Sequence, residues 1–251
     1  MSKIVSIHSF RGGTGKSNTT ANLSALLAME GFRVGVVDTD IQSPGIHVLF
    51  GMDDSDMEHS LNDYLWGKCD IKDTAHDVTG RLGAEVKGQI FLIPSSIKAG
   101  EIARILREGY DVGLLTDGFR DVVSKMNLDY LLIDTHPGLN EETLLSIAIS
   151  QALVIIMRPD SQDYQGTAVT VDVARKLDVP NMLMVVNKVP QAFDIEDVRS
   201  RVENSFKCKV AAVIPHSDEM MALASSGIFS LHYPDNPVTK EYKKLVEKVK
   251  A

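Results

Sequence analysis

The chain has 251 residues, of which 26 are Lys or Arg and 34 are Asp or Glu, so its formal net charge is −8. Apolar residues make up 44% of the chain and charged residues 24%, proportions that suit a folded protein with a sizeable core and exclude intrinsic disorder. The acidic balance excludes a global electrostatic footprint for nucleic acid or anionic membranes, although a local basic patch remains compatible with it.

The sequence gives no sign of export or of metal chemistry based on thiols. The two cysteines, Cys69 and Cys208, show neither a CxxC pair nor the spacing of a zinc or iron–sulfur site, so we expect two reduced thiols. The longest apolar stretch, residues 144–157, is broken by polar residues and falls short of the ~20 residues that a membrane helix needs. The N-terminal apolar run lacks a signal-peptide cleavage site. We therefore expect a cytoplasmic protein.

Short apolar runs alternate with helical patterns along the chain. Most of the runs are continuously apolar, which is typical of a parallel sheet covered on both faces. The expected strands are residues 3–8, 33–37, 90–93, 130–134, 152–157, 182–187 and 210–214, and the expected helices include 18–30, 141–150 and 166–177. The irregular, acidic residues 52–88 are expected to form a helical excursion between two strands. We predict one α/β domain over residues 1–251, a doubly wound, mostly parallel sheet with helices on both faces.

A glycine-rich segment follows the first expected strand and precedes the first helix. Its small residues would let backbone N–H groups curl around phosphate oxygens, and the helix N-terminus would add a favourable dipole. The predicted nucleotide-binding residues are Gly12, Gly13, Thr14, Gly15, Lys16, Ser17 and Asn18. Lys16 would reach the β- and γ-phosphates, and the Ser17 hydroxyl would bind Mg²⁺. Phe10 replaces the first glycine of the GxxxxGKS/T pattern, so a chance glycine turn before a helix is the alternative interpretation.

Polar residues also follow three other expected strands, in the segments 37–45, 132–138 and 185–188. Sheets of this class bind ligands at the carboxyl ends of their strands. We therefore predict Asp38 and Asp134 beside a magnesium ion, where a carboxylate can hold metal-bound water. Each aspartate alone would more often be a helix cap or a turn residue. Together with the glycine-rich segment they indicate a nucleotide site.

In this order the segments resemble the MinD/ParA-type ATPases, P-loop NTPases of the SIMIBI class with a deviant Walker A motif. Segments 11–17, 38–45, 60–67, 94–96, 134–138, 187–188 and 214–227 carry the resemblance. It implies ATP/ADP and Mg²⁺ as ligands, ATP hydrolysis, and a homodimer whose subunits face each other across two nucleotides. By the same resemblance, Asp40 orients the attacking water, Asn187 reads the adenine and Pro215 flanks the base.

The family's signature lysine, which crosses to the partner's phosphates, is replaced here by Arg11. Arginine keeps the charge and offers a planar fork suited to bidentate phosphate contact. We predict that Arg11 acts in trans as an arginine finger, and the alternative is an exposed loop residue. The carboxysome-positioning McdA-like members also depart at this lysine and are one candidate subgroup. His136 departs from a more usual proline, either as a tolerated loop residue or as a modifier of the second switch loop.

The resemblance implies spatial positioning or partition of DNA or a protein cargo, with an activating partner protein. A basic cluster, formed by Arg199, Arg201, Lys207 and Lys209, would suit non-specific DNA and a place on the nucleoid, or simply a solvated helix face. Residues 240–250 have an amphipathic pattern. MinD proteins bind membranes with such a helix, but this one lacks the Phe or Trp of an interfacial helix, which favours packing on the domain.

Two other functions compete with this interpretation, and the iron–sulfur carriers are set aside. A nucleotide-gated regulatory binding module with little ATP turnover would use the same site, and the Arg11 and Phe10 departures keep it open. A small-molecule ligase or kinase would need a second substrate pocket, to which nothing in the sequence points. Iron–sulfur carriers of the superfamily need paired cysteines at the dimer interface, which Cys69 and Cys208 do not supply.

Overall fold

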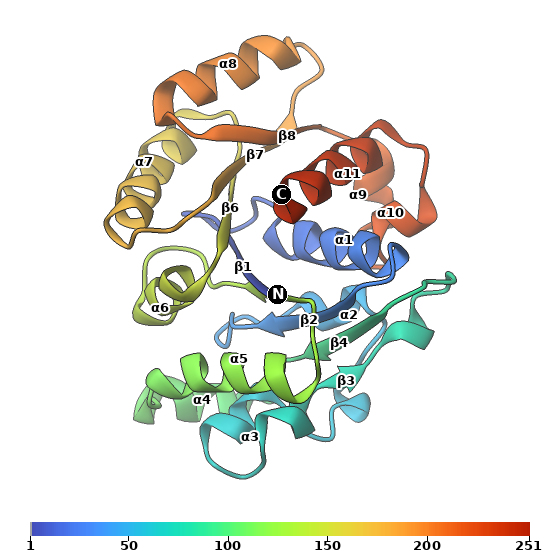
Figure 1. Cartoon of the computed structure of the whole chain (residues 1–251), viewed down its shortest axis with the longest axis vertical. Helices are drawn as coiled ribbons and strands as arrows, with labels where there is room; N and C mark the ends of the chain where they lie inside the picture. Colours follow the sequence, from blue (N-terminus) through green and yellow to red (C-terminus); the bar gives the residue numbers. More distant parts are fainter. Residues whose placement is uncertain (1) are drawn as a thin grey trace.

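One mostly parallel sheet organises the chain, as seen in a computed structural model that describes residues 2–251 (Figure 1). Its strand order is β3-β4-β2-β5-β1-β6-β7-β8, and within this sheet all pairs are parallel except the β3–β4 pair at one edge. The strands are β1 (Lys3–His8), β2 (Arg33–Asp38), β3 (His76–Asp77), β4 (Gln89–Ile93), β5 (Tyr130–Asp134), β6 (Ala152–Met157), β7 (Met182–Val189) and β8 (Lys209–Pro215). The expected α/β fold is confirmed.

Helices cover both faces of the sheet because successive strand residues point to opposite sides. Val5 and Ile7 of β1 pack under α1, α2, α10 and α11, whereas Ile4 packs with the helices of the other face. On that second face, α6, α7 and α8 cover β6 to β8, and α3, α4 and α5 cover β2, β4 and β5 (Figure 1). The helices are α1 (Lys16–Met29), α2 (Ile46–Leu49), α3 (Leu61–Leu65), α4 (Ala99–Glu108), α5 (Gly113–Lys125), α6 (Glu141–Ile149), α7 (Ser161–Lys176), α8 (Ile195–Phe206), α9 (Asp218–Leu223), α10 (Phe229–His232) and α11 (Pro237–Lys250).

Two helices begin earlier than their apolar spacing indicates, each for a local reason. α1 begins at Lys16 instead of residue 18. The residue before it, Gly15, has a φ of 102°, which lies outside the range of a right-handed helix, so the loop ends there. α7 begins at Ser161 instead of residue 166, because the Asp160 side chain accepts hydrogen bonds from two backbone N–H groups of the first turn. Both helix starts are therefore set by polar or glycine residues, which an apolar pattern does not register.

The sheet also differs from expectation at its edges. The two-residue strand β3, within the irregular segment 52–88, pairs antiparallel with β4 and is too short for any periodicity to reveal. That segment also contains short helical turns, as expected: α3 and the 3₁₀ turns Asp54–Asp56, Ile71–Thr74 and Thr79–Arg81. β7 continues to Val189, and its pairing with β8 is irregular between Val186 and Val189.

Phe10, which replaces the first glycine of the loop pattern, has a structural explanation. Its ring lies against Gly166 of α7, where a Cβ atom would overlap the ring. The helix thus leaves space for an aromatic side chain at the start of the loop, and Phe10 joins the loop to the second face of the sheet.

The C-terminal helix α11 packs on the rest of the chain, which is the alternative that its sequence favoured over membrane binding. Tyr242, Leu245, Val246 and Val249 are fully or almost fully buried against α1 and the sheet. Within residues 2–251, no helix has the length and apolar character to cross a membrane.

We predict that Leu245→Ala lowers the free energy of unfolding by about 2–5 kcal/mol, because it leaves a cavity in a fully buried part of the core. Urea denaturation measures this change. Lys248→Ala, on the exposed side of the same helix, is the matched control and should stay within about 0.5 kcal/mol of the wild type. If both variants lose the same small amount, α11 does not belong to the core.

Candidate nucleotide-binding site

The glycine loop between β1 and α1 adopts a conformation that requires glycine at two positions. Gly13 and Gly15 have φ values of 73° and 102°, in the left-handed region where a Cβ atom is unfavourable. At Gly15 a Cβ atom would also overlap the Asn187 side chain. The chain can therefore turn into the N-terminus of α1 only with this glycine in place.

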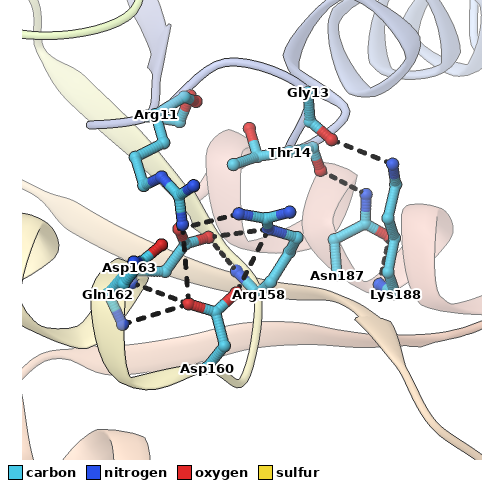
Figure 2. A network of polar contacts seen from close by, with 10 residues as sticks. Arg11, Gly13, Thr14, Arg158, Asp160, Gln162, Asp163, Asn187 and Lys188 are labelled. Atoms are coloured by element: carbon cyan, nitrogen blue, oxygen red, sulfur yellow. Dashed lines mark hydrogen bonds and ion pairs between the residues drawn. The ribbon is translucent and has the colours of Figure 1, made fainter.

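The end of β7 holds this loop from one side (Figure 2). Asn187 Nδ2 donates to the Thr14 carbonyl over 2.7 Å, and Lys188 Nζ donates to the Gly13 carbonyl over 2.9 Å. Two consecutive loop carbonyls are thus bound by two consecutive residues. Asn187, the predicted adenine reader, is buried and contacts the loop, while the sequence assigned no role to Lys188.

Two buried carboxylates lie at neighbouring strand ends behind the loop. The parallel register pairs Asp134 with Ile7 of β1 and with Asp38 of β2. Burial raises the pKa of Asp134 to about 6, against the lowering effects of hydrogen bonds from Ser17 and Thr20 and of the Lys16 charge. Burial and the charge of Asp134 likewise raise the pKa of Asp38. Positive charge nearby therefore favours the ionised form of both groups.

Lys16 supplies part of that positive charge. Its side chain is buried, which lowers the pKa of Lys16, while Asp134, Asp40 and Asp38 act in the opposite direction. The Asp38 carboxylate also accepts the backbone N–H groups of Asp40 and Gly45, at 3.0 and 3.2 Å. Asp38 thus fixes the start of the segment that presents Asp40.

Asp40, the predicted water-orienting residue, reaches the cavity with His136 beside it. Asp40 Oδ1 lies 3.6 Å from His136 Nε2 and accepts the Ser43 N–H over 3.2 Å. Burial raises the pKa of Asp40, and the charges of His136 and Lys16 oppose that rise. His136 therefore lies next to a predicted functional residue and is placed to influence it.

A cavity of about 610 Å³ opens above the loop. Of the predicted site residues, Gly12, Gly13, Gly15, Lys16, Ser17, Asn18, Asp40, Asn187 and Pro215 line it. The other lining residues are Ser43, His136, Pro137, Lys188, His216, Ser217, Met220, Met221, Ala224 and Ser225. Those from Ser217 onward belong to α9 and its flanks, and the sequence predicted no site residue among them. Thr14, Asp38 and Asp134 are buried and do not line the cavity.

Arg11 lies apart from the cavity and points towards the start of α7 (Figure 2). Its Nη1 is 3.4 Å from Asp163 Oδ1 and 3.8 Å from Asp160 Oδ1. Arg158 holds the same buried Asp163 more closely, with its backbone N–H at 2.8 Å and its Nε at 3.1 Å. Burial raises the pKa of Asp163, but the hydrogen bonds of Arg158 and the charge of Arg11 bring it below its usual value.

The donor set behind the loop fits magnesium better than a metal held entirely by protein. Among residues 2–251 no cluster of three His, Cys, Asp or Glu side chains is placed to hold a metal ion. Two buried carboxylates and the Ser17 hydroxyl supply hard oxygen donors, and Mg²⁺ is usually bound by one or two carboxylates together with substrate phosphates. The oxygen donors of the predicted magnesium residues Ser17, Asp38 and Asp134 therefore suit Mg²⁺ in their chemistry, and Ser17 also lines the cavity.

A glycine loop at the N-terminus of a helix, a buried lysine and acidic strand ends define a P-loop nucleotide-binding protein. A family model described as ParA, NUBPL iron-transfer P-loop NTPase, matches residues 1–250, so the chain belongs to the ParA family of P-loop NTPases. The resemblance to MinD/ParA-type ATPases is thereby confirmed.

Two curated relatives show how far the similarity extends. An uncharacterized ATP-binding protein of Methanocaldococcus jannaschii is 28% identical over 246 residues, which cover 96% of this chain and 86% of the relative. An iron-sulfur cluster carrier protein of Pyrococcus furiosus is 23% identical over 260 residues, which cover 98% of this chain and 84% of the relative.

Solved structures of low sequence identity share the fold. The septum site-determining protein MinD of Pyrococcus horikoshii, complexed with Mg-ADP, superposes with a TM-score of 0.81 at 22% identity, covering 99% of this chain and 96% of that one. The apo McdA of Cyanthece gives a TM-score of 0.76 at 18% identity over the whole of both chains. At these identities the likeness establishes the fold alone.

His8 lies in the core directly beneath the loop and gives a pH prediction. Its Nδ1 is 2.8 Å from Thr135 Oγ1, and burial, followed by the charges of Lys16 and His136, lowers the pKa of His8 to about 3. An unfolded histidine titrates near pH 6.5. The native state therefore binds fewer protons between these two values, and stability is lost as the pH falls below about 6.5.

Because only the unfolded state protonates His8 in this range, we predict that the free energy of unfolding of the wild type falls by about 1.5 kcal/mol between pH 6.5 and pH 5. The His8→Asn variant should lack this decrease. Urea denaturation of both proteins across this range measures the difference. If the two pH profiles run parallel, His8 takes up a proton without penalty in the folded chain.

Proposed function

We propose that the chain is a Mg²⁺-dependent ATP hydrolase that forms an ATP-sandwich homodimer. The observation that carries this proposal is the meeting of Lys16, Ser17 and Asp40 in one cavity above the constrained glycine loop. Phosphoryl transfer depends on positioning and charge neutralisation more than on covalent chemistry, and these side chains supply both. The curated relative from M. jannaschii, whose name states ATP binding, supports the choice of nucleotide.

In this proposal the residues divide among the phosphates, the attacking water, Mg²⁺ and the adenine. Lys16 and the loop N–H groups would bind the β- and γ-phosphates, and Asp40 would orient the water. Ser17, Asp38 and Asp134 would hold Mg²⁺, which supplies charge neutralisation between the phosphates. Asn187 and Pro215 would border the adenine, together with Met220 and Met221 of α9, which line the same cavity.

Arg11 would complete the partner's site, which requires it to leave its present contacts. Its ion-pair distances to Asp160 and Asp163 are long, and Arg158 satisfies the buried Asp163 independently. Releasing Arg11 therefore leaves no buried carboxylate unpaired, which keeps the cost of the movement low. A guanidinium held loosely at the edge of its own site is suited to transfer towards a partner's phosphates.

Arg11→Ala should abolish ATP-dependent dimerisation and reduce ATP turnover by about 100-fold or more, because it removes a charge made available only in the dimer. Light scattering with ATP and phosphate release measure the two effects. Arg107→Ala is the matched control, since Arg107 is exposed on α4 and pairs with Glu108.

Asp160→Asn makes the complementary change. It keeps the helix cap but removes one negative charge beside Arg11, so the variant should dimerise at lower ATP concentrations than the wild type. Normal dimerisation and turnover by Arg11→Ala would refute the trans role of Arg11. Dimerisation without turnover by the wild type would favour a nucleotide-gated binding module.

A second candidate is iron–sulfur cluster transfer, because the family description and the P. furiosus relative both name iron chemistry. The cysteines of this chain argue against cluster binding. Burial raises the pKa of both thiols, and a raised pKa disfavours the thiolate that binds iron. Cys208 directly precedes the edge strand β8. Cys69 lies two residues before Ile71, which packs with the core over β2, β4 and β5 in the other half of the sheet, so the two thiols do not form a pair within one chain.

We expect that anaerobic incubation with ferrous iron and sulfide leaves no iron on the protein after gel filtration, both in the wild type and in the Cys69→Ser/Cys208→Ser double variant. Iron and sulfide analysis of the protein fraction measures this. If the wild type retains both elements in stoichiometric amounts and the double variant loses them, cluster transfer becomes the preferred function.

The biological output we propose is positioning or partition of DNA or a protein cargo, aided by an activating partner protein. Non-specific DNA would need exposed basic residues on the dimer. Arg199 and Arg201 pair with Glu196 and Asp197 on their own helix, so the predicted basic cluster keeps Lys207 and Lys209 as its uncommitted exposed charges. DNA therefore has less support than the four basic residues alone suggest.

A further inference from the structure

We propose that Lys188 is a positioning residue for the glycine loop, which turns the Gly13–Thr14 peptide so that its N–H faces the nucleotide phosphates. The proposal rests on the proposed function, because it assumes that the loop binds phosphate. It assigns a role to a residue whose charge the ATPase mechanism above leaves unused.

The argument begins with two consecutive carbonyl groups. Lys188 binds the Gly13 carbonyl and Asn187 binds the Thr14 carbonyl (Figure 2). In a planar trans peptide the C=O and the following N–H point in opposite directions. Both carbonyls are drawn towards the end of β7, so the N–H groups of Thr14 and Gly15 are directed away from it, where an anion bound in the loop would lie.

The backbone at the end of β7 is shaped for this contact. Lys188 has a φ of 57°, in the left-handed region that non-glycine residues rarely adopt, and it lies where the pairing of β7 with β8 is irregular. Asn187 Oδ1 accepts the Lys188 N–H over 2.8 Å and so holds this conformation. Such backbone strain persists only where the surrounding contacts support it. Here it directs two adjacent side chains at the same loop.

The charge of Lys188 is committed to the loop. Within residues 2–251 no carboxylate lies at ion-pair distance from its ammonium group, and the Gly13 carbonyl is the partner that the structure shows. A charged donor strengthens a hydrogen bond to a carbonyl. Lys188 also lines the cavity, and its ammonium group binds the loop. Removal of the ammonium group with an unbranched stem retained should therefore weaken phosphate binding and spare the contacts of the base.

The test is Lys188→Met, which keeps an unbranched stem and removes the donor. Isothermal titration calorimetry with ADP and with adenosine separates phosphate binding from base binding, and it requires neither dimerisation nor turnover. We expect the Kd for ADP to rise about tenfold and the Kd for adenosine to change by less than about twofold. Lys188→Arg, which keeps a donor on a long stem, should recover most of the ADP affinity.

Lys207→Met is the matched control, because Lys207 is another exposed lysine with a left-handed φ, of 52°, at the end of α8. It should bind ADP like the wild type. Equal losses of ADP and adenosine affinity in Lys188→Met, or no loss of either, would overturn the proposal. A wild type that binds neither ligand would overturn the proposed function and this inference with it, whereas unchanged ADP binding by Lys188→Met alone leaves the proposed function standing.

Discussion

The parallel register of three strands governs the candidate site. The sheet pairs Ile7 of β1 with Asp134 of β5, and Asp134 with Asp38 of β2. It therefore brings two buried carboxylates together at the carboxyl ends of neighbouring strands. Two such groups are costly without positive partners, which explains the raised pKa of each. The buried Lys16, at the start of α1, neutralises part of this charge. A bound cation would supply what Lys16 leaves unmet.

The glycine loop is shaped from the opposite side by the end of β7. Gly15 is confined both by its own φ and by the nearby Asn187 side chain, so the loop and the strand can adopt only compatible conformations. Asn187 and Lys188 thus connect the end of β7 to the loop through the carbonyl groups of two adjacent peptides.

Arg11 belongs to a different arrangement, in which two arginines share two aspartates at the start of α7. Asp163 is buried and closely bound by Arg158, so it remains paired whether or not Arg11 is present. Phe10, packed against Gly166, anchors the chain immediately before Arg11. The backbone of the loop is thus fixed on α7, while the guanidinium of Arg11 has only long ion-pair contacts to lose. The side chain of Arg11 can therefore change direction while the backbone of the loop stays in place.

What the sequence can predict depends on whether a feature arises from neighbours along the chain or from contacts between distant segments. The strands and the glycine loop depend on neighbours along the chain, so apolar runs and glycine spacing identified most of them within a residue or two. The sequence did not predict β3, because two residues are too few to show a periodicity. It did not predict the start of α7, because the capping residue Asp160 is polar and adds nothing to an apolar pattern. The contacts of Arg11 with Asp163 and of Lys188 with Gly13 join residues 152 and 175 positions apart. Residue type alone suggests that such cations bind anions, but only the folded chain shows that one binds a carboxylate of its own subunit and the other a backbone carbonyl. A motif therefore locates the candidate site, and long-range packing determines which charges remain available to act in it.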